Sequence, residues 1–139
     1  MGTRSTIALE FADGTVEQVY CHWDGYLSHN GAILSKHYSD PFKLRDLIDL
    51  GDLSSLAENI GTKHNFSDRV DGECTFYARD RSETGCEAKK FASFADYKDN
   101  HQYEEYEYIL RTDGLWYVGI GEGVYIQLAS ALASTEECV

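Results

Sequence analysis

The sequence has little proline and no long uninterrupted apolar run. Its 139 residues include one proline and 42% hydrophobic residues, and no repeat or low-complexity linker is evident, so we expect a single folded domain spanning residues 1–139. The longest mainly apolar stretch, 124–133, is far shorter than the roughly 18 residues of a membrane span. The first residues lead directly into a strand pattern and lack the apolar core of a secretion signal. We therefore expect a soluble cytoplasmic protein that does not bind membranes.

The cysteines lack the spacing of a redox or zinc motif. Cys21, Cys74, Cys86 and Cys138 contain no CxxC pair, and they are too widely separated to supply close pairs of zinc ligands. Nothing indicates secretion, so reduced thiols are expected. No metal or other cofactor is predicted.

Basic residues are few. The chain has 12 Lys and Arg against 24 Asp and Glu, a net charge of −12. Residues 1–70 contribute −4 and residues 71–139 contribute −8. Such a charge repels nucleic acid and anionic membranes and attracts basic partners. The alternative is that the high net charge only keeps the protein soluble.

Turn and alternation patterns predict three hairpins. Residues 6–11 and 15–22 alternate around Asp13-Gly14, and residues 103–111 and 115–120 do so around Asp113-Gly114. A two-residue turn at the first pair places Ile7 opposite Tyr20 and Phe11 opposite Val16. The third hairpin is predicted to join strands near 74–81 and 86–93 through residues 82–85, with Arg81 opposite Cys86 and Cys74 opposite Ser93.

Helical spacing predicts the remaining elements. A short helix is expected over 32–38, and a second begins at Asp40-Pro41, buries Phe42, Leu44, Leu47, Ile48 and Leu50, and ends at Gly51. A helical turn over 53–60, a loop over 62–72, a short helix or link over 94–100 and a final helix over 124–134 follow. The predicted fold is α+β: an antiparallel sheet of about three hairpins with two or three helices on one face.

The run YCHWDGY, Tyr20 to Tyr26, is the densest group of chemically capable side chains. It follows a predicted strand, where binding residues often lie. His22, Trp23, Asp24 and Tyr26 are candidates for a ligand site, and His22, Asp24 and His29 for a metal site, but local hydrogen bonding and packing are the favoured explanation of the run. Cys21 is a weak candidate nucleophile, because adjacent strand residues point to opposite faces and His22 cannot serve as its base.

A second candidate surface mixes carboxylates with tyrosines. Its acidic members are Asp96, Asp99, Glu104, Glu105 and Glu107. Lys98 is the only Lys or Arg between residues 91 and 110, so we expect these carboxylates to bind a basic partner, in place of nucleic acid phosphates. Further along, Gly119, Gly121 and Gly123 lack the strand–helix context of a dinucleotide fingerprint, and they are predicted to admit a close neighbour.

Three segments carry a resemblance to a known family. TRSTIA (3–8), DGTVEQVYCHWDGY (13–26) and DLGDLSSL (49–56) resemble a family of small uncharacterised phage and prophage proteins. The resemblance covers about the first 60 residues well and implies no catalytic residue, because the family has no assigned activity. It implies a phage or mobile-element accessory protein that acts in the cytoplasm of a bacterial host.

The hypothesis that follows is a non-enzymatic, acidic inhibitor of a nucleic-acid-binding host defence protein, of the anti-CRISPR or anti-restriction type. The partner would be a protein with a basic nucleic-acid-binding surface, with no direct binding to nucleic acid. The alternative is a small-molecule, nucleotide or metal-binding protein, such as a hydrolase, with its site at the YCHWDGY run. A structural role in the virion stays open, as does the oligomeric state.

Overall fold

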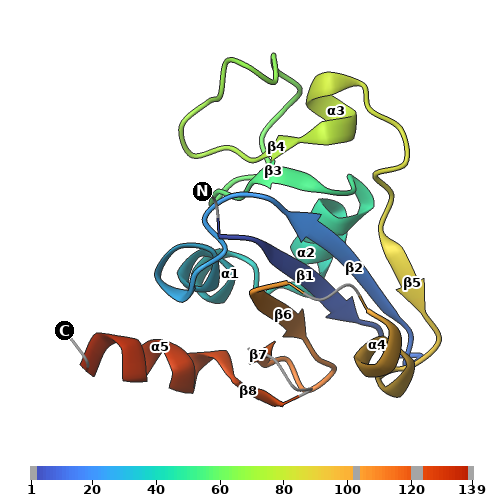
Figure 1. The fold of residues 1–139 in the computed structure, drawn as a ribbon, viewed down its shortest axis with the longest axis vertical. Coiled ribbons are helices and arrows are strands. Elements are labelled where there is room, and N and C mark those ends of the chain that lie inside the picture. The colour runs from blue at the N-terminus through green and yellow to red at the C-terminus, as the bar shows by residue number, and fades with distance from the viewer. Residues whose placement is uncertain (1–2, 102–103, 120–123, 138–139) are drawn as a thin grey trace.

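The chain forms a mixed sheet with helices on both faces (Figure 1). The computed structural model describes residues 3–101, 104–119 and 124–137. Within them, eight strands form one sheet in the order β4-β3-β2-β1-β6-β7-β8, and β5 pairs with β2 outside this path. The strands are β1 (Ser5–Glu10), β2 (Val16–Cys21), β3 (Leu53–Ser55), β4 (Thr75–Phe76), β5 (Lys89–Phe91), β6 (Tyr106–Leu110), β7 (Trp116–Gly119) and β8 (Tyr125–Gln127). The helices are the π-helix η1 (Leu27–Gly31), α1 (Ala32–His37), α2 (Pro41–Asp49), α3 (Tyr77–Arg81), α4 (Phe94–Asn100) and α5 (Leu128–Glu137).

The predicted hairpin between β1 and β2 is confirmed, but its register is shifted by one residue. The Gly14 N–H donates to the Phe11 carbonyl (2.9 Å), and Gly14 has a φ of 92°. This is a three-residue loop, a type I turn followed by a left-handed glycine, in place of the predicted two-residue turn. Ile7 therefore lies opposite Val19 and not Tyr20. The observed register puts the core residues Ile7 and Val19 on the same face of the sheet, and the Tyr20 side chain points to the opposite face.

The hairpin between β6 and β7 is also confirmed and repeats the same loop. The Arg111 N–H donates to the Leu115 carbonyl (3.1 Å), and Gly114 has a φ of 81°. The prediction of a wholly antiparallel sheet is wrong, however, because β1 pairs with β6 in parallel and β2 with β3 in parallel. Turn residues specify which strands form a hairpin, but they carry no information on how two hairpins pair.

The third predicted hairpin is wrong. Residues 77–81 form helix α3, which ends at Ser82 in the left-handed conformation (φ 55°). The predicted pairs of Arg81 with Cys86 and of Cys74 with Ser93 are therefore absent, and β5 pairs with β2. The Asp80 carboxylate accepts a hydrogen bond from the Phe76 N–H (2.8 Å), which stabilises the turn from β4 into α3.

Two predicted helices are confirmed in residues 32–49. The Asp40 carboxylate caps α2 by accepting from the Phe42 N–H (2.9 Å). Leu44, Leu47 and Ile48 are buried as predicted, but Phe42 is 78% exposed. The helical turn predicted over 53–60 is wrong, because its first residues form β3.

The C-terminal segments agree with the predictions in part. Residues 94–100 form α4, whereas the helix predicted over 124–134 begins only at Leu128, after β8. A Cβ on Gly119 would lie 2.8 Å from the Tyr125 ring, which agrees with the predicted close approach at this glycine. Residues 120–123, with the other two glycines of that pattern, and Cys138 lie outside the described residues.

The helices cover both faces of the sheet, which corrects the prediction of one covered face. Ile7 and Leu9 of β1 pack in a core cluster with residues of α1, α2 and α5. Ala8, which points to the opposite face, packs with Val16, Ile109 and Tyr97 of α4. Because side chains alternate between the two faces of a strand, each face of the sheet has its own hydrophobic core, and α4 packs against the smaller one. No helix within the described residues is long and apolar enough to cross a membrane.

Asp80 also tethers the loop predicted over 62–72. Its side chain is fully buried and accepts hydrogen bonds from the His64 N–H (3.0 Å) and from Arg79 (3.0 Å). Burial raises the pKa of the Asp80 carboxyl, but the hydrogen bonds from Arg79, Phe76 and His64 outweigh burial, and the pKa is lowered overall.

We predict that Asp80→Asn lowers the free energy of unfolding at pH 7 by about 1–3 kcal/mol, because an amide cannot accept all of these hydrogen bonds. A lowered pKa contributes stability above the unfolded value of roughly 3.9, and that contribution disappears as pH falls through the folded pKa. Urea unfolding of both proteins should therefore give a difference that shrinks below about pH 4. If the difference in unfolding free energy were the same at pH 7 and below about pH 4, the stabilising role of the Asp80 carboxylate would be contradicted.

Candidate functional site

The YCHWDGY run begins in β2 and leads into η1. The Tyr20 hydroxyl and His22 Nδ1 are 2.7 Å apart, and the His22 and Trp23 rings meet edge to face at 4.7 Å. Burial, together with the nearby Arg4 and Arg69, lowers the pKa of His22. The imidazole is therefore neutral at pH 7, and one of its nitrogens is engaged by the neighbouring tyrosine.

The second half of the run holds three parts of the fold together. Asp24 adopts the left-handed conformation (φ 57°), and its carbonyl accepts from the Asn30 N–H of η1 (3.2 Å). The Gly25 N–H donates to the Thr3 carbonyl (2.7 Å), and the Gly25 carbonyl accepts from the Tyr108 hydroxyl of β6 (2.6 Å). The main chain of this run thus joins the start of the chain, η1 and β6.

Asn30 is a structural partner of this run that the sequence analysis missed. Its side chain is buried and donates to the Ser5 hydroxyl (3.2 Å) and to the Trp23 carbonyl (3.4 Å). No local pattern in the sequence indicates that this amide is buried.

The candidate ligand residues of the run contact their neighbours in the chain. His22, Trp23 and Asp24 are half-buried, and Tyr26, 39% exposed, has its ring 6.0 Å from the ring of His29. Within the described residues, no three His, Cys, Asp or Glu side chains lie where they could hold a metal ion. The contacts of this run are those of a folding element.

Cys21 is unsuited to nucleophilic chemistry. Its side chain is fully buried, and burial raises the pKa of the thiol to about 12. The Asn30 side chain approaches the sulfur at 3.4 Å. Cys74 is also buried and free, and Cys86 is free and half-buried. Cys21 therefore packs as a protonated core residue.

Glu107 lies inside the protein and not on an acidic surface. It is 3% exposed, and its Oε1 lies 2.7 Å from Nε2 of His101, which is also buried. The Tyr125 hydroxyl donates to the same oxygen (3.1 Å). Glu107 therefore anchors the end of α4 and the edge strand β8 to the face of the sheet, and it cannot contact a partner in this structure.

Asp96 has a structural role of its own. It is half-buried, and its N–H donates to the hydroxyl of Ser93, the N-cap of α4 (3.0 Å). Its carboxylate accepts from the Ala92 N–H (2.9 Å) and from the Asn100 side chain (2.8 Å). Internal hydrogen bonds thus occupy about half of its acceptor sites.

The other three carboxylates of this candidate surface are accessible. Asp99 and Glu105 are exposed and Glu104 is half-buried, and none forms an ion pair with a described residue. Glu104 is near enough to Tyr20 and His22 to affect their titration. The structure thus brings Glu104 beside the start of the YCHWDGY run, a juxtaposition that the sequence did not predict.

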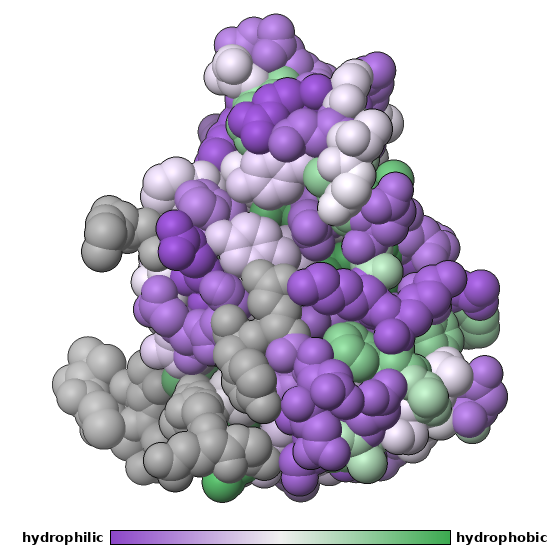
Figure 2. Space-filling view, turned by 45° about the vertical axis from the view of Figure 1, so that its right-hand side comes forward, coloured by the Kyte–Doolittle hydropathy of each residue, from purple (hydrophilic) through white to green (hydrophobic). Residues whose placement is uncertain are grey.

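Basic side chains interrupt this acidic region. Lys98 of α4 lies over the Phe94 ring (5.7 Å), and Lys89 and Lys90 of β5 are exposed. Hydrophilic residues cover most of the face seen in Figure 2, with a smaller apolar area at its lower right. Lys98 directly precedes one of the accessible carboxylates, Asp99, in the chain.

We predict that Glu107→Lys lowers the free energy of unfolding by about 3–5 kcal/mol, because it removes the carboxylate beside His101 Nε2 and places an ammonium group in a buried position. Glu105→Lys, two residues away and exposed, is the matched control and should change stability by no more than about 0.5 kcal/mol. Urea unfolding distinguishes the two. Equal small effects would mean that Glu107 is accessible after all.

We predict that Gly25→Ala lowers the free energy of unfolding by about 1–3 kcal/mol, because the added Cβ has no space. It would lie 2.7 Å from Ser5 Cβ and 2.9 Å from the Thr3 carbonyl oxygen. Ser28→Ala adds no atoms at an exposed position of the same segment and should be nearly neutral. Thermal unfolding of both variants provides the measurement, and an unchanged Gly25→Ala midpoint would refute the tight contact.

Comparison with known proteins adds no functional assignment. No protein-family model, no curated protein and no solved structure matches the chain. The likeness to phage and prophage proteins therefore stays a resemblance carried by the three quoted segments. The roles of individual residues follow only from their contacts in this structure.

Proposed function

We propose that the chain is a non-enzymatic binding protein, a phage or mobile-element accessory factor that inhibits a basic, nucleic-acid-binding host defence protein. It would act in the cytoplasm of a bacterial host and occupy the partner's nucleic-acid-binding surface, in the manner of anti-CRISPR or anti-restriction proteins. The observation that carries this proposal is the group of accessible carboxylates without ion pairs, Asp99, Glu104 and Glu105, on a chain of net charge −12.

The state of the reactive side chains favours binding over catalysis. Cys21 is buried and protonated, and the His22 ring is engaged by Tyr20. A catalytic cysteine needs an accessible sulfur beside a base, and the Cys21 sulfur is buried. The alternative of a small-molecule or metal site at the YCHWDGY run consequently has weaker support.

Charge and position suit a basic partner. Unpaired surface carboxylates accept hydrogen bonds from Arg and Lys without first breaking an internal ion pair. Electrostatic attraction of this kind accelerates association and selects the sign of the partner's charge. Glu107, which is buried, is not part of the proposed contact, and Asp96 contributes little.

We predict that Asp99→Lys/Glu104→Lys/Glu105→Lys abolishes capture of a basic nucleic-acid-binding protein from bacterial lysate, because reversed charges repel it. The tagged wild-type chain should retain the partner at low salt and release it at high salt, since exposed charges are screened. Purified partner should then be assayed for nucleic acid binding with each variant.

The control is Asp49→Lys/Asp68→Lys/Asp71→Lys, which changes the net charge equally at exposed positions elsewhere. It should retain most of the capture. If both triple variants lose capture equally, net charge and not the proposed surface is responsible. Unchanged inhibition by the first variant would refute the proposal.

A further inference from the structure

A cavity lies at the carboxyl ends of the two central parallel strands. β1 and β6 run side by side, and then β1 turns towards β2 while β6 turns towards β7, on the opposite side. Connections that leave neighbouring parallel strands in opposite directions open a crevice outside the strand ends, and in open α/β sheets such crevices hold ligands. Here the crevice has a volume of about 270 Å³, and the start of α2 closes its third side.

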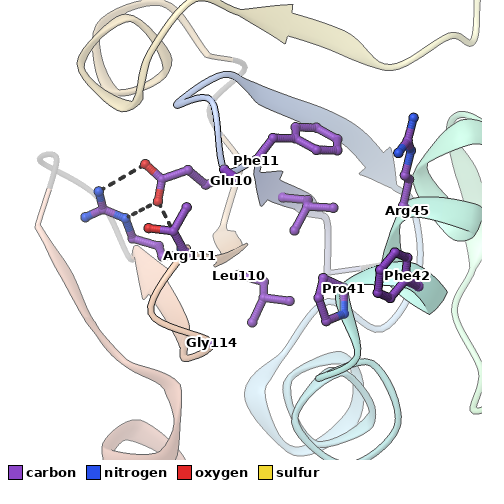
Figure 3. A pocket seen from close by; sticks show the side chains of 11 residues that line it. Glu10, Phe11, Pro41, Phe42, Arg45, Leu110, Arg111 and Gly114 are labelled. Carbon is purple, nitrogen blue, oxygen red and sulfur yellow. Dashed lines mark hydrogen bonds and ion pairs between the residues drawn. The ribbon is translucent and has the colours of Figure 1, made fainter.

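The walls of this cavity are mainly apolar. Leu9 and Leu110 are buried at its base, and Phe11, Pro41 and Phe42 surround it (Figure 3). Phe42 is the most exposed large hydrophobic side chain among the described residues, at 78%. A ligand with an apolar body would gain free energy by covering this ring and the walls beside it.

Two of the charged residues that line the cavity neutralise each other. Arg111 Nε lies 3.0 Å from Glu10 Oε1. Strand alternation places both side chains on the face of the sheet that α4 covers, and the Arg111 guanidinium lies over the Phe94 ring of α4 (3.6 Å). Figure 3 shows this pair on the side of the cavity away from Arg45. The pair therefore brings no net charge to the cavity.

Arg45 is the charged residue that α2 contributes to the lining. It follows Pro41 and Phe42 by four and three residues, and residues at these separations share one face of a helix. Its guanidinium carbon lies 5.8 Å from the centre of the Phe11 ring, and the side chain forms no ion pair with a described residue. The cavity thus joins apolar walls to one guanidinium that has no carboxylate beside it.

The carboxylates nearest to these segments in the chain are engaged elsewhere or point elsewhere. Asp13 and Asp113 accept hydrogen bonds from hydroxyl groups of their own hairpins (2.7 and 2.6 Å), and Asp40 caps α2. Asp46 follows Arg45 on α2, about 100° further around the helix. None of the four is among the described residues that line the cavity. An anion in the cavity therefore meets Arg45 in direct contact and these carboxylates only at longer range, where salt screens them.

We propose that this cavity binds a small organic carboxylate, with an apolar or aromatic body against the walls and the carboxylate against Arg45. The planar guanidinium of arginine pairs with a carboxylate through two parallel hydrogen bonds. The volume lies close to the lower end of the range for small-molecule sites, roughly 300–1,000 Å³, so the ligand is a small one. The site lies at the opposite end of β1 and β6 from Glu104, and it does not rest on the function proposed above.

The test titrates four probes, phenylpropionate, phenylpropanol, phenylpropylamine and propionate, into ¹⁵N-labelled protein. Phenylpropionate should shift the amide signals of Phe11, Arg45, Thr112 and Gly114 saturably. Phenylpropanol should bind about tenfold more weakly, because it lacks the charge-assisted hydrogen bonds, and propionate should also do so, because it lacks the apolar contact. No saturable shift with phenylpropionate, or binding of the alcohol or the amine as tight as that of the acid, would overturn the proposal.

Two variants test the site from the side of the protein. Arg45→Gln should weaken phenylpropionate binding about tenfold and leave phenylpropanol binding unchanged, because only the carboxylate needs the guanidinium. Arg81→Gln, which removes the same charge from an exposed position on α3, is the control and should bind like the wild type. Equal affinity of Arg45→Gln and wild type for phenylpropionate would refute the site, and so would an equal loss for the acid and the alcohol. Failure here leaves the proposal at Asp99, Glu104 and Glu105 untouched, because those residues are intact in both variants.

Discussion

The parallel pairing of β1 with β6 holds this fold together. Each strand belongs to a local hairpin, and their pairing, from Ser5 opposite Tyr106 to Leu9 opposite Leu110, joins the two hairpins into one sheet. Isolated two-stranded hairpins are marginally stable in water, so both depend on this contact. The Tyr108 hydroxyl reinforces it by donating to the Gly25 carbonyl across 83 positions of sequence.

This pairing also decides where the chemically interesting residues lie. At the amino ends of β1 and β6, the YCHWDGY run and Glu104 come together. At the carboxyl ends, the two hairpin loops diverge and leave the apolar cavity beside α2. One long-range contact therefore positions two separate surfaces, one at each end of these strands.

The polar groups of the sheet illustrate why reactive side chains need not be functional. His101 and Glu107 form a buried pair under α4, and Asn30 satisfies the main chain at Trp23. Buried polar groups without partners are costly, so each of these side chains is explained by the neighbour that it satisfies. Asp99, Glu104 and Glu105, by contrast, form no ion pair with a described residue, and they are the residues of the proposed contact.

Local signals in the sequence determined both Asp-Gly hairpins, the Asp40 cap of α2 and the loop over 62–72, because each depends on residues only a few positions apart. The tertiary structure alone decided the parallel pairing, the helix at 77–81 and the two covered faces. It also decided that Glu107 is buried and Glu105 exposed, although both sit in the same acidic stretch. Strand alternation predicts two faces but not what covers them, and here α4 covers the face of Glu107.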